Sequence, residues 1–324
     1  MTSRNPPATL DYEDLGFGIT RIDSGMIRTG LAALYLLQSE GECALVETGT
    51  HRSIPAIQAL LQQRGIAPPQ LKYIIPTHVH LDHAGGVGGL MQCFPDATLL
   101  VHPKGARHLI DPAKLKAGAI AVYGEDQFAR VYGDVIPVDA DRVQAMGDGE
   151  QVKLGDRALT FHDTPGHARH HFCVQDSISN GLFTGDTFGL AYPELATAAG
   201  PFIIPTTTPV QFDPQALQQS ITRLLALQPE RMFLTHYGVV ENPAPLGSAL
   251  IEQIRAYLNM VARARGEPME QWEPFLRQQL TDYTFARAGA HGCTLNPDAL
   301  QRVLGMDMEL NAQGLAVWMQ SQTG

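Results

Sequence analysis

Residues 77–83 read Thr-His-Val-His-Leu-Asp-His and place three imidazoles and one carboxylate directly after an apolar segment. Buried side chains of this kind need partners, so ordinary core packing does not account for the cluster. Imidazole nitrogen and carboxylate oxygen are ligands of zinc, iron and related metals. His78 and His80 are two residues apart, so on an extended segment they leave the same face and can share one metal. Asp82 and His83 precede a glycine-rich turn, which can direct them towards a second metal.

The segments before this cluster indicate alternating strands and helices. Residues 27–38 and 42–47 are apolar runs that suit buried strands, and a helix is expected at 54–64 with Ser53 as its N-cap. The next strand, 71–75, leads directly into the histidine cluster. Sites at the ends of strands are the usual arrangement in layered α/β folds.

After the cluster the pattern predicts several strands in succession. A short helix at 86–93 and a strand at 97–101 come first, followed by a mainly helical insertion at 103–132, broken at Pro112 and Gly118. Further strands are expected at 135–138, 151–154, 157–162, 172–175 and 181–184. The order predicts an α/β (α+β layered) fold, in which a sheet packs on a sheet and helices flank the pair.

A shift in composition at 241–247 divides the chain into an expected main domain, 1–242, and a C-terminal helical extension, 243–324. Beyond the shift apolar residues recur at helical spacing, and helices are also expected at 268–289 and 297–320. Two interpretations remain open for the extension. It packs on the core or forms a homodimer contact, or it covers the active site and selects the substrate.

Charge and cysteine content narrow the class of protein. The net charge is -10, from 33 acidic and 23 basic residues, which argues against nucleic acid or anionic lipid as a partner. The four cysteines are scattered, as expected of reduced thiols: Cys43, Cys93, Cys173 and Cys293. No apolar run is long enough for a bilayer, and no signal core is visible, so a cytoplasmic location is expected.

A site with two metals needs more than four ligands, and three further residues qualify. His167 follows a Pro-Gly turn, and Asp186 and His236 each follow an apolar strand-like segment. A carboxylate such as Asp186 can bridge two cations through its two oxygens. Taken singly, each of the three has an ordinary structural explanation.

The combined pattern is more specific than its parts. The HxHxDH run that begins at His78 is followed by Thr-Pro-Gly-His at 164–167, Gly-Asp at 185–186 and Thr-His-Tyr-Gly at 235–238. This order resembles the metallo-β-lactamase superfamily over roughly residues 15 to 240. The resemblance implies an αββα sandwich with the metals at the sheet edges, to which this chain adds its C-terminal helical extension.

The resemblance also implies a ligand set. One metal would be held by His78, His80 and His167. The other would be held by Asp82, His83 and His236, with Asp186 and a water or hydroxide as bridges. The expected cofactors are two divalent ions, zinc first, with iron or manganese as alternatives because the same ligand types suit all three.

Several neighbouring residues receive supporting or catalytic roles. Glu47 stands where many relatives carry a supporting Asp, and His171 is expected to support the site rather than bind metal. Asp82 would orient the hydroxide and shuttle a proton, and Tyr237 or Tyr192 would donate a hydrogen bond to the developing oxyanion. The proline- and threonine-rich segment 200–209 is either a rigid pocket wall or a plain connection.

The expected activity is hydrolysis of a small-molecule ester, lactone or thioester by metal-activated water. Alternatives are a phosphodiesterase of the same fold and a mononuclear iron sulfur dioxygenase. A regulatory protein with little turnover is a further alternative, against which the complete ligand set argues.

Overall fold

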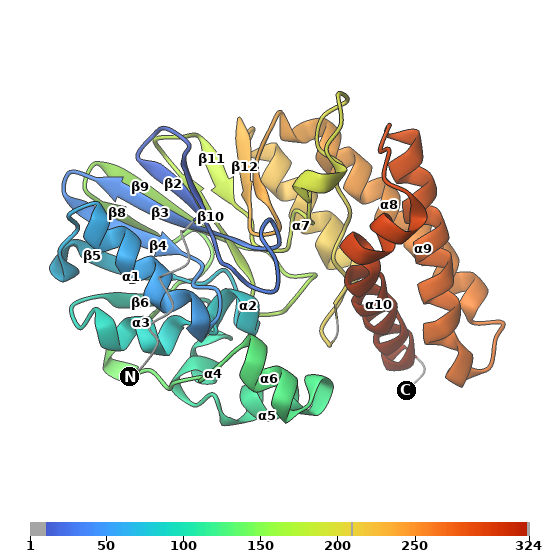
Figure 1. The fold of residues 1–324 in the computed structure, drawn as a ribbon, viewed down its shortest axis with the longest axis horizontal. Helices are drawn as coiled ribbons and strands as arrows, with labels where there is room; N and C mark the ends of the chain where they lie inside the picture. The colour runs from blue at the N-terminus through green and yellow to red at the C-terminus, as the bar shows by residue number, and fades with distance from the viewer. Residues whose placement is uncertain (1–10, 209, 323–324) are drawn as a thin grey trace, which may run out of the picture. The chain divides into compact units, whose positions relative to one another are not determined.

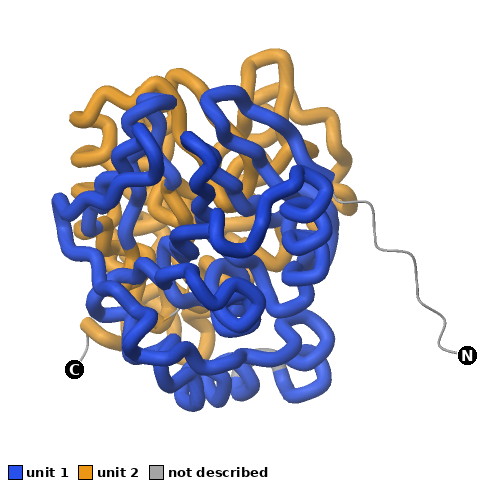
Figure 2. The backbone as a smooth tube through the Cα atoms, turned by 90° about the vertical axis from the view of Figure 1, so that its left-hand side faces the viewer, with its two compact units in different colours: residues 1–163, 172–183 blue, residues 164–171, 184–324 orange. Residues whose placement is uncertain are grey.

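The computed structural model describes residues 11–208 and 210–322. The chain forms two compact units (Figure 2). Unit 1 comprises residues 1–163 and 172–183, and unit 2 comprises residues 164–171 and 184–324. The predicted boundary between residues 242 and 243 separates the last strand from the first C-terminal helix and stays a prediction about domains.

Unit 1 contains a seven-stranded mixed sheet in the order β1 to β7, seen in blue to green in Figure 1. Its strands are β1 (Tyr12–Asp14), β2 (Ile19–Asp23), β3 (Ala33–Ser39), β4 (Glu42–Val46), β5 (Leu71–Ile75), β6 (Thr98–Val101) and β7 (Val143–Ala145). The pairs from β1 to β4 are antiparallel, whereas the pairs from β4 to β7 are parallel. Parallel neighbours need long crossover connections, and the helices of unit 1 lie in those connections.

These helices occupy the three crossovers of the first sheet. They are α1 (Ile54–Gln63), α2 (Leu81–Ala84), α3 (Val87–Cys93), α4 (Ala106–Ile110), α5 (Ala113–Tyr123) and α6 (Glu125–Val131). Leu34 and Leu36 of β3 belong to one apolar cluster with Ile57 and Leu60 of α1. Because alternate residues of a strand face opposite sides, this face of the sheet is covered by helices.

The other face of the sheet packs against a second group of strands within unit 1. These strands are antiparallel: β8 (Gln151–Leu154), β9 (Arg157–Asp163), β10 (Phe172–Asp176) and β11 (Gly181–Phe183). The ring of Tyr35, between Leu34 and Leu36 on β3, lies 5.2 Å from the ring of Phe183 on β11, centroid to centroid. The predicted sheet-on-sheet core with flanking helices is therefore confirmed.

Unit 2 is mainly helical. It consists of α7 (Pro214–Ala226), the hairpin of β12 (Arg231–Leu234) and β13 (Gly238–Glu241), and the helices α8 (Pro243–Ala264), α9 (Trp272–Ala290) and α10 (Pro297–Ser321). Asp213 is the N-cap residue of α7, since its carboxylate accepts from two backbone N–H groups at 3.0 Å. The expected C-terminal helices are confirmed, and α9 and α10 lie side by side (Figure 1).

Three local predictions were wrong. The strand predicted at 27–38 begins at Ala33, because Ile27 is 60% exposed and has a φ of +58°. Residues 135–138 are not a strand, and β7 forms further along the chain. Gly118 does not break its helix, since one glycine costs a helix only about 1 kcal/mol. Instead α5 ends at Tyr123, before Gly124, whose φ is +77°.

Among the helices of residues 11–208 and 210–322, none has both the length and the apolar character that a bilayer crossing requires.

Candidate metal centre

In unit 1 the chain leaves β5 and enters the histidine cluster through an irregular segment. His80 is the N-cap residue of α2, so Asp82 and His83 lie on a short helix, and Gly85 and Gly86 form the turn that follows it. The glycine at 85 has helical φ and ψ values, which explains why the chain coils here instead of reversing. His78 and His83 are fully buried, and Asp82 keeps 25% of its side chain exposed.

The side chains of the cluster converge in two pairs. His78 Nε2 and His80 Nδ1 are 2.8 Å apart, which is within hydrogen-bond distance. His83 Nε2 lies 3.4 Å from Asp82 Oδ2. These are the pairings that the sequence predicted, although the backbone between His78 and His80 is not a strand.

The buried carboxylate of Glu47 fixes the orientation of two imidazoles of the cluster, one directly and one through Thr77. Glu47 is 0% exposed and accepts from Thr77 N at 3.1 Å, from Thr77 Oγ1 at 2.5 Å and from His83 Nδ1 at 2.9 Å. A carboxylate accepts hydrogen bonds, so His83 Nδ1 carries the proton and Nε2 keeps its lone pair. The hydroxyl of Thr77 gives its proton to Glu47 and therefore accepts from His78 Nδ1, 3.2 Å away. Both imidazoles thus carry the ring proton on Nδ1 and the lone pair on Nε2.

In unit 2 each predicted ligand follows a tight turn or a strand end. His167 follows Gly166, whose φ is +134° and where a Cβ would come within 2.3 Å of the Leu217 backbone. Glycine is therefore required for the loop to reach this position. His236 follows β12 after one residue, and Asp186 follows a glycine with a φ of +47°.

The carboxylate of Asp186 lies between two histidines of unit 2. Its Oδ2 is 3.3 Å from His167 Nε2, and its Oδ1 is 3.5 Å from His236 Nε2. A direct charge-assisted hydrogen bond would be about 2.7–2.9 Å long. Two ligands bound tetrahedrally to one zinc at about 2.0–2.1 Å are about 3.3 Å apart. The residues therefore fit a carboxylate that offers each oxygen to a different metal.

His171 supports Asp186 rather than adding a ligand. Its Nε2 accepts from the backbone N–H of Asp186 at 3.1 Å, and its Nδ1 donates to Thr164 Oγ1 at 2.8 Å. Both ring nitrogens are thus engaged in hydrogen bonds, in agreement with the supporting role expected from the sequence.

The two predicted catalytic tyrosines are both in unit 2. The hydroxyl of Tyr192 donates to Asp307 Oδ1 of α10 at 3.1 Å. Tyr237 is adjacent to His236 in the chain and is 7% exposed. Their catalytic role stays a prediction. Thr206, whose hydroxyl lies 3.1 Å from His167 Nδ1, was not predicted from the sequence. The three consecutive threonines at 206–208 were a signal, but nothing in the sequence linked them to His167.

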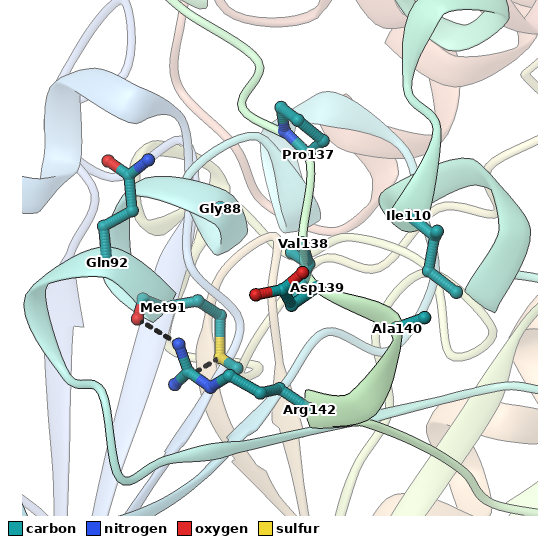
Figure 3. Close-up of a pocket in the computed structure, with 9 residues that line it drawn as sticks. All are labelled: Gly88, Met91, Gln92, Ile110, Pro137, Val138, Asp139, Ala140 and Arg142. Atoms are coloured by element: carbon teal, nitrogen blue, oxygen red, sulfur yellow. Dashed lines mark hydrogen bonds between the residues drawn. The ribbon is translucent and has the colours of Figure 1, made fainter.

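A cavity of about 520 Å³ in unit 1 is a separate feature. None of the predicted ligands lines it; its wall consists of Gly88, Met91, Gln92, Ile110, Pro137, Val138, Asp139, Ala140 and Arg142 (Figure 3). The guanidinium of Arg142 donates to the carbonyls of Met91, Phe94 and Ala97 at 2.6–2.8 Å. These carbonyls are at and just beyond the end of α3, so Arg142 serves as a cap for that helix.

Comparison with known proteins places these features in a family. The sequence profile of the metallo-beta-lactamase superfamily matches residues 28–236. The metallo-beta-lactamase fold-containing protein ST1585 of Sulfurisphaera tokodaii is 30% identical over 228 residues, which are 69% of this chain and 79% of that protein. A crystal structure of an archaeal superfamily protein, ST1585 from Sulfolobus tokodaii, has a TM-score of 0.60 at 29% identity and covers 74% of this chain and 86% of that one.

Two further relatives have enzyme names. Acyl-coenzyme A thioesterase MBLAC2 of Homo sapiens is 28% identical over 189 residues, 54% of this chain and 65% of the relative. Hydroxyacylglutathione hydrolase of Salmonella paratyphi B is 27% identical over 152 residues, 47% of this chain and 45% of the relative. The match thus spans less than two thirds of either enzyme.

Proposed function

Because this chain belongs to the metallo-β-lactamase superfamily, we propose that it hydrolyses a small acyl thioester, ester or lactone at a binuclear metal centre. The observation that carries the proposal is the position of Asp186, with one oxygen facing His167 and the other facing His236. A mononuclear site would need one carboxylate oxygen, whereas this arrangement offers both.

We assign the ligands as the family pattern implies. The first metal would be held by His78, His80 and His167, the second by Asp82, His83 and His236, and both by Asp186. Zinc is the first choice of metal, with iron or manganese as alternatives. The hydrogen bonds within unit 1 support this assignment, because they place the ring protons of His78 and His83 on Nδ1 and the lone pairs on Nε2.

When bound, the metals would lower the pKa of a bridging water, polarise the scissile carbonyl and stabilise the oxyanion. The chain supplies the remaining functions. The carboxylate of Asp82 is partly exposed and lies beside buried His83, so it can orient the water and pass a proton to solvent. Glu47 keeps His83 in one tautomer and ring orientation. Tyr237, adjacent to His236 in the chain, or Tyr192 would donate a hydrogen bond to the oxyanion.

Acyl thioesters are the first substrate class to test. One relative is named an acyl-coenzyme A thioesterase and another a hydroxyacylglutathione hydrolase, and both names describe hydrolysis of an acyl group from a carrier. The net charge of -10 gives no sign of a surface for nucleic acid, so phosphodiesters rank lower. The substrate is therefore proposed to be a small molecule.

The first experiment measures metal content and hydrolysis together. The protein, purified without added metal and then loaded, is analysed for zinc, iron and manganese and assayed with acyl-coenzyme A, acyl-glutathione, lactone and phosphodiester substrates. About two equivalents of metal and turnover of one acyl class support the proposal. One iron, no hydrolysis, and oxygen uptake with a persulfide would replace it with the dioxygenase alternative.

A matched pair of variants tests the bridging role. Asp186→Asn keeps the size of the side chain but removes its charge and one oxygen, so we expect metal content to fall to about one equivalent and turnover to be lost. Asp213→Asn removes a carboxylate of the same unit that caps α7, a role that Asn fulfils equally well. Equal metal content in both variants would refute the assignment of Asp186.

A further inference from the structure

The last helix of the chain is connected to a predicted metal ligand by a short series of hydrogen bonds. We propose that α10, through Asn311, positions the imidazole of His167 so that Nε2 faces the metal. This inference rests on the proposed role of His167 as a ligand. It assigns to the C-terminal extension a task in building the site, beyond packing, dimer contact or substrate selection.

The first link joins α10 to the segment 205–207. Asn311 is 2% exposed, and its Oδ1 accepts from the backbone N–H of Thr207 at 2.6 Å. Its Nδ2 donates to the carbonyl of Pro205 at 3.1 Å. The hydroxyl of Thr207 donates to the backbone carbonyl of Asn311 at 2.9 Å. One side chain thus binds the backbone on both sides of Thr206 and fixes the position of that residue.

The packing of α10 on this segment is unusually close. Gly314 lies three residues after Asn311, on the same face of the helix, and a Cβ there would come within 1.4 Å of the Thr207 carbonyl oxygen. A second helix adds to the support, because Gln253 of α8 is fully buried and donates to the carbonyl of Ile203 at 2.9 Å. The segment is therefore held by backbone contacts that depend on specific residues of both helices.

The second link joins Thr206 to His167. The hydroxyl of Thr206 donates its proton to the carbonyl of Asp186 at 3.1 Å. A hydroxyl has one proton, so at the 3.1 Å contact with His167 Nδ1 the threonine oxygen must accept. The other contacts of the ring are longer: Thr208 Oγ1 lies 3.4 Å from each nitrogen, and Asp186 Oδ2 lies 3.3 Å from Nε2. The shorter Thr206 contact therefore favours the neutral imidazole with its proton on Nδ1 and its lone pair on Nε2. Thr206 therefore sets the tautomer that metal binding requires and braces the backbone of Asp186 as well.

The test reads the tautomer directly in metal-free protein. Nitrogen-15 NMR of the imidazole, measured about two pH units above the ordinary histidine pKa of about 6.5, distinguishes Nδ1–H from Nε2–H; a His167→Gln variant assigns the signal. We expect a single Nδ1–H form in the wild type and in Thr206→Ser, which keeps the hydroxyl. Thr206→Val, of equal size, and Asn311→Ala are expected to show mixed tautomers.

The control is Leu304→Ala, which removes a fully buried apolar side chain from the same helix. It should lower stability yet keep the wild-type tautomer. The proposal is overturned if Asn311→Ala or Thr206→Val keeps the single Nδ1–H form, or if Leu304→Ala shifts the equilibrium as much as Asn311→Ala. Because Thr206→Val does not alter α10, it also decides the second link if Asn311→Ala fails to fold.

Zinc titration gives a second readout and separates this inference from the proposed function. Loss of a residue that orients a ligand typically weakens metal binding about 10–100-fold, which is the change expected for one equivalent in Asn311→Ala and Thr206→Val. If His167→Ala binds both equivalents like the wild type, the ligand assignment of the proposed function fails. The tautomer measurement then still decides whether α10 orients the imidazole.

Discussion

Replacing Glu47 by glutamine should disturb the hydrogen bonds that orient the imidazoles of His78 and His83. Both carboxylate oxygens are used: Oε1 accepts from Thr77 Oγ1 and His83 Nδ1, and Oε2 accepts from Thr77 N. Glutamine has the same shape but offers one acceptor. If its oxygen takes the Oε1 position, its NH₂ group meets the N–H of Thr77. If the amide is reversed, His83 must accept at Nδ1, and its proton moves to Nε2, where it blocks metal binding.

The expected loss in the free energy of unfolding follows from the number of hydrogen bonds that Glu47 accepts. A hydrogen bond to a charged group contributes about 1.5–3 kcal/mol, and an unsatisfied buried donor costs about 1–3 kcal/mol. Because Glu47 is fully buried, water cannot replace the lost acceptor. We therefore expect Glu47→Gln to lower the free energy of unfolding of the metal-free protein by about 2–4 kcal/mol. Affinity for one metal equivalent should fall about 10–100-fold.

Urea denaturation of the metal-free protein measures the first quantity, and competition titration with zinc measures the second. The control is Glu13→Gln, which removes a carboxylate of the same unit from an exposed ion pair with Arg21 and should cost at most about 1 kcal/mol. If Glu47→Gln matches the control in both measurements, Glu47 does not orient the cluster, and the tautomer argument for His78 and His83 fails.

Three further predictions concern other parts of the chain. Asp176→Asn should lower the free energy of unfolding by about 3–5 kcal/mol, because Arg157, 2.6 Å away and fully buried, loses its counter-ion. Denaturation measures this value, and a loss below about 1 kcal/mol, as for an exposed ion pair, would contradict the prediction. Burial raises the pKa of Cys43 to about 11. Mass spectrometry should therefore find that thiol unalkylated at pH 8 in the native state and alkylated after unfolding. The stability that the neutral thiol contributes should be lost as the pH rises through about 11. Gly166→Ala should weaken metal binding, because the new Cβ clashes with the backbone of Leu217. The control is Gly149→Ala, a site with a positive φ but open space around it. It should lower the free energy of unfolding by about 1–2 kcal/mol and leave metal binding intact.

The sequence was most informative where chemistry and secondary structure coincide. The strand β5 and its histidine cluster could be predicted because apolar residues end abruptly at ligand-type residues. The strand predicted at residues 27–32 was wrong, because an apolar run does not distinguish a strand from a loop and the positive φ of Ile27 has no sequence signal. The short helix that contains Asp82 and His83 was not predicted, because its 4 residues are too few to show a helical spacing of apolar residues.

The residues that orient the ligands were harder to predict than the ligands. Thr207 and Asn311 are 104 positions apart, and neither is of a type that indicates a metal site. Their effect depends on which backbone groups remain without partners once the segment is folded, and that requires the tertiary structure. Glu47 was recognisable because its position in the family pattern marked it, whereas Thr206 had no such mark.

The two units prepare their ligands by the same principle with different groups. In unit 1 the acceptor that holds a proton on Nδ1 is the carboxylate of Glu47, reinforced by Thr77. In unit 2 it is the hydroxyl of Thr206, whose own proton is committed to the carbonyl of Asp186. Each set is therefore oriented by its own unit before a metal binds, so a variant at Glu47 and one at Thr206 should have additive effects on the metal-free protein. Coupling between the two variants that appears when zinc is added would then report that one centre uses both sets, which is the central claim of the proposed function.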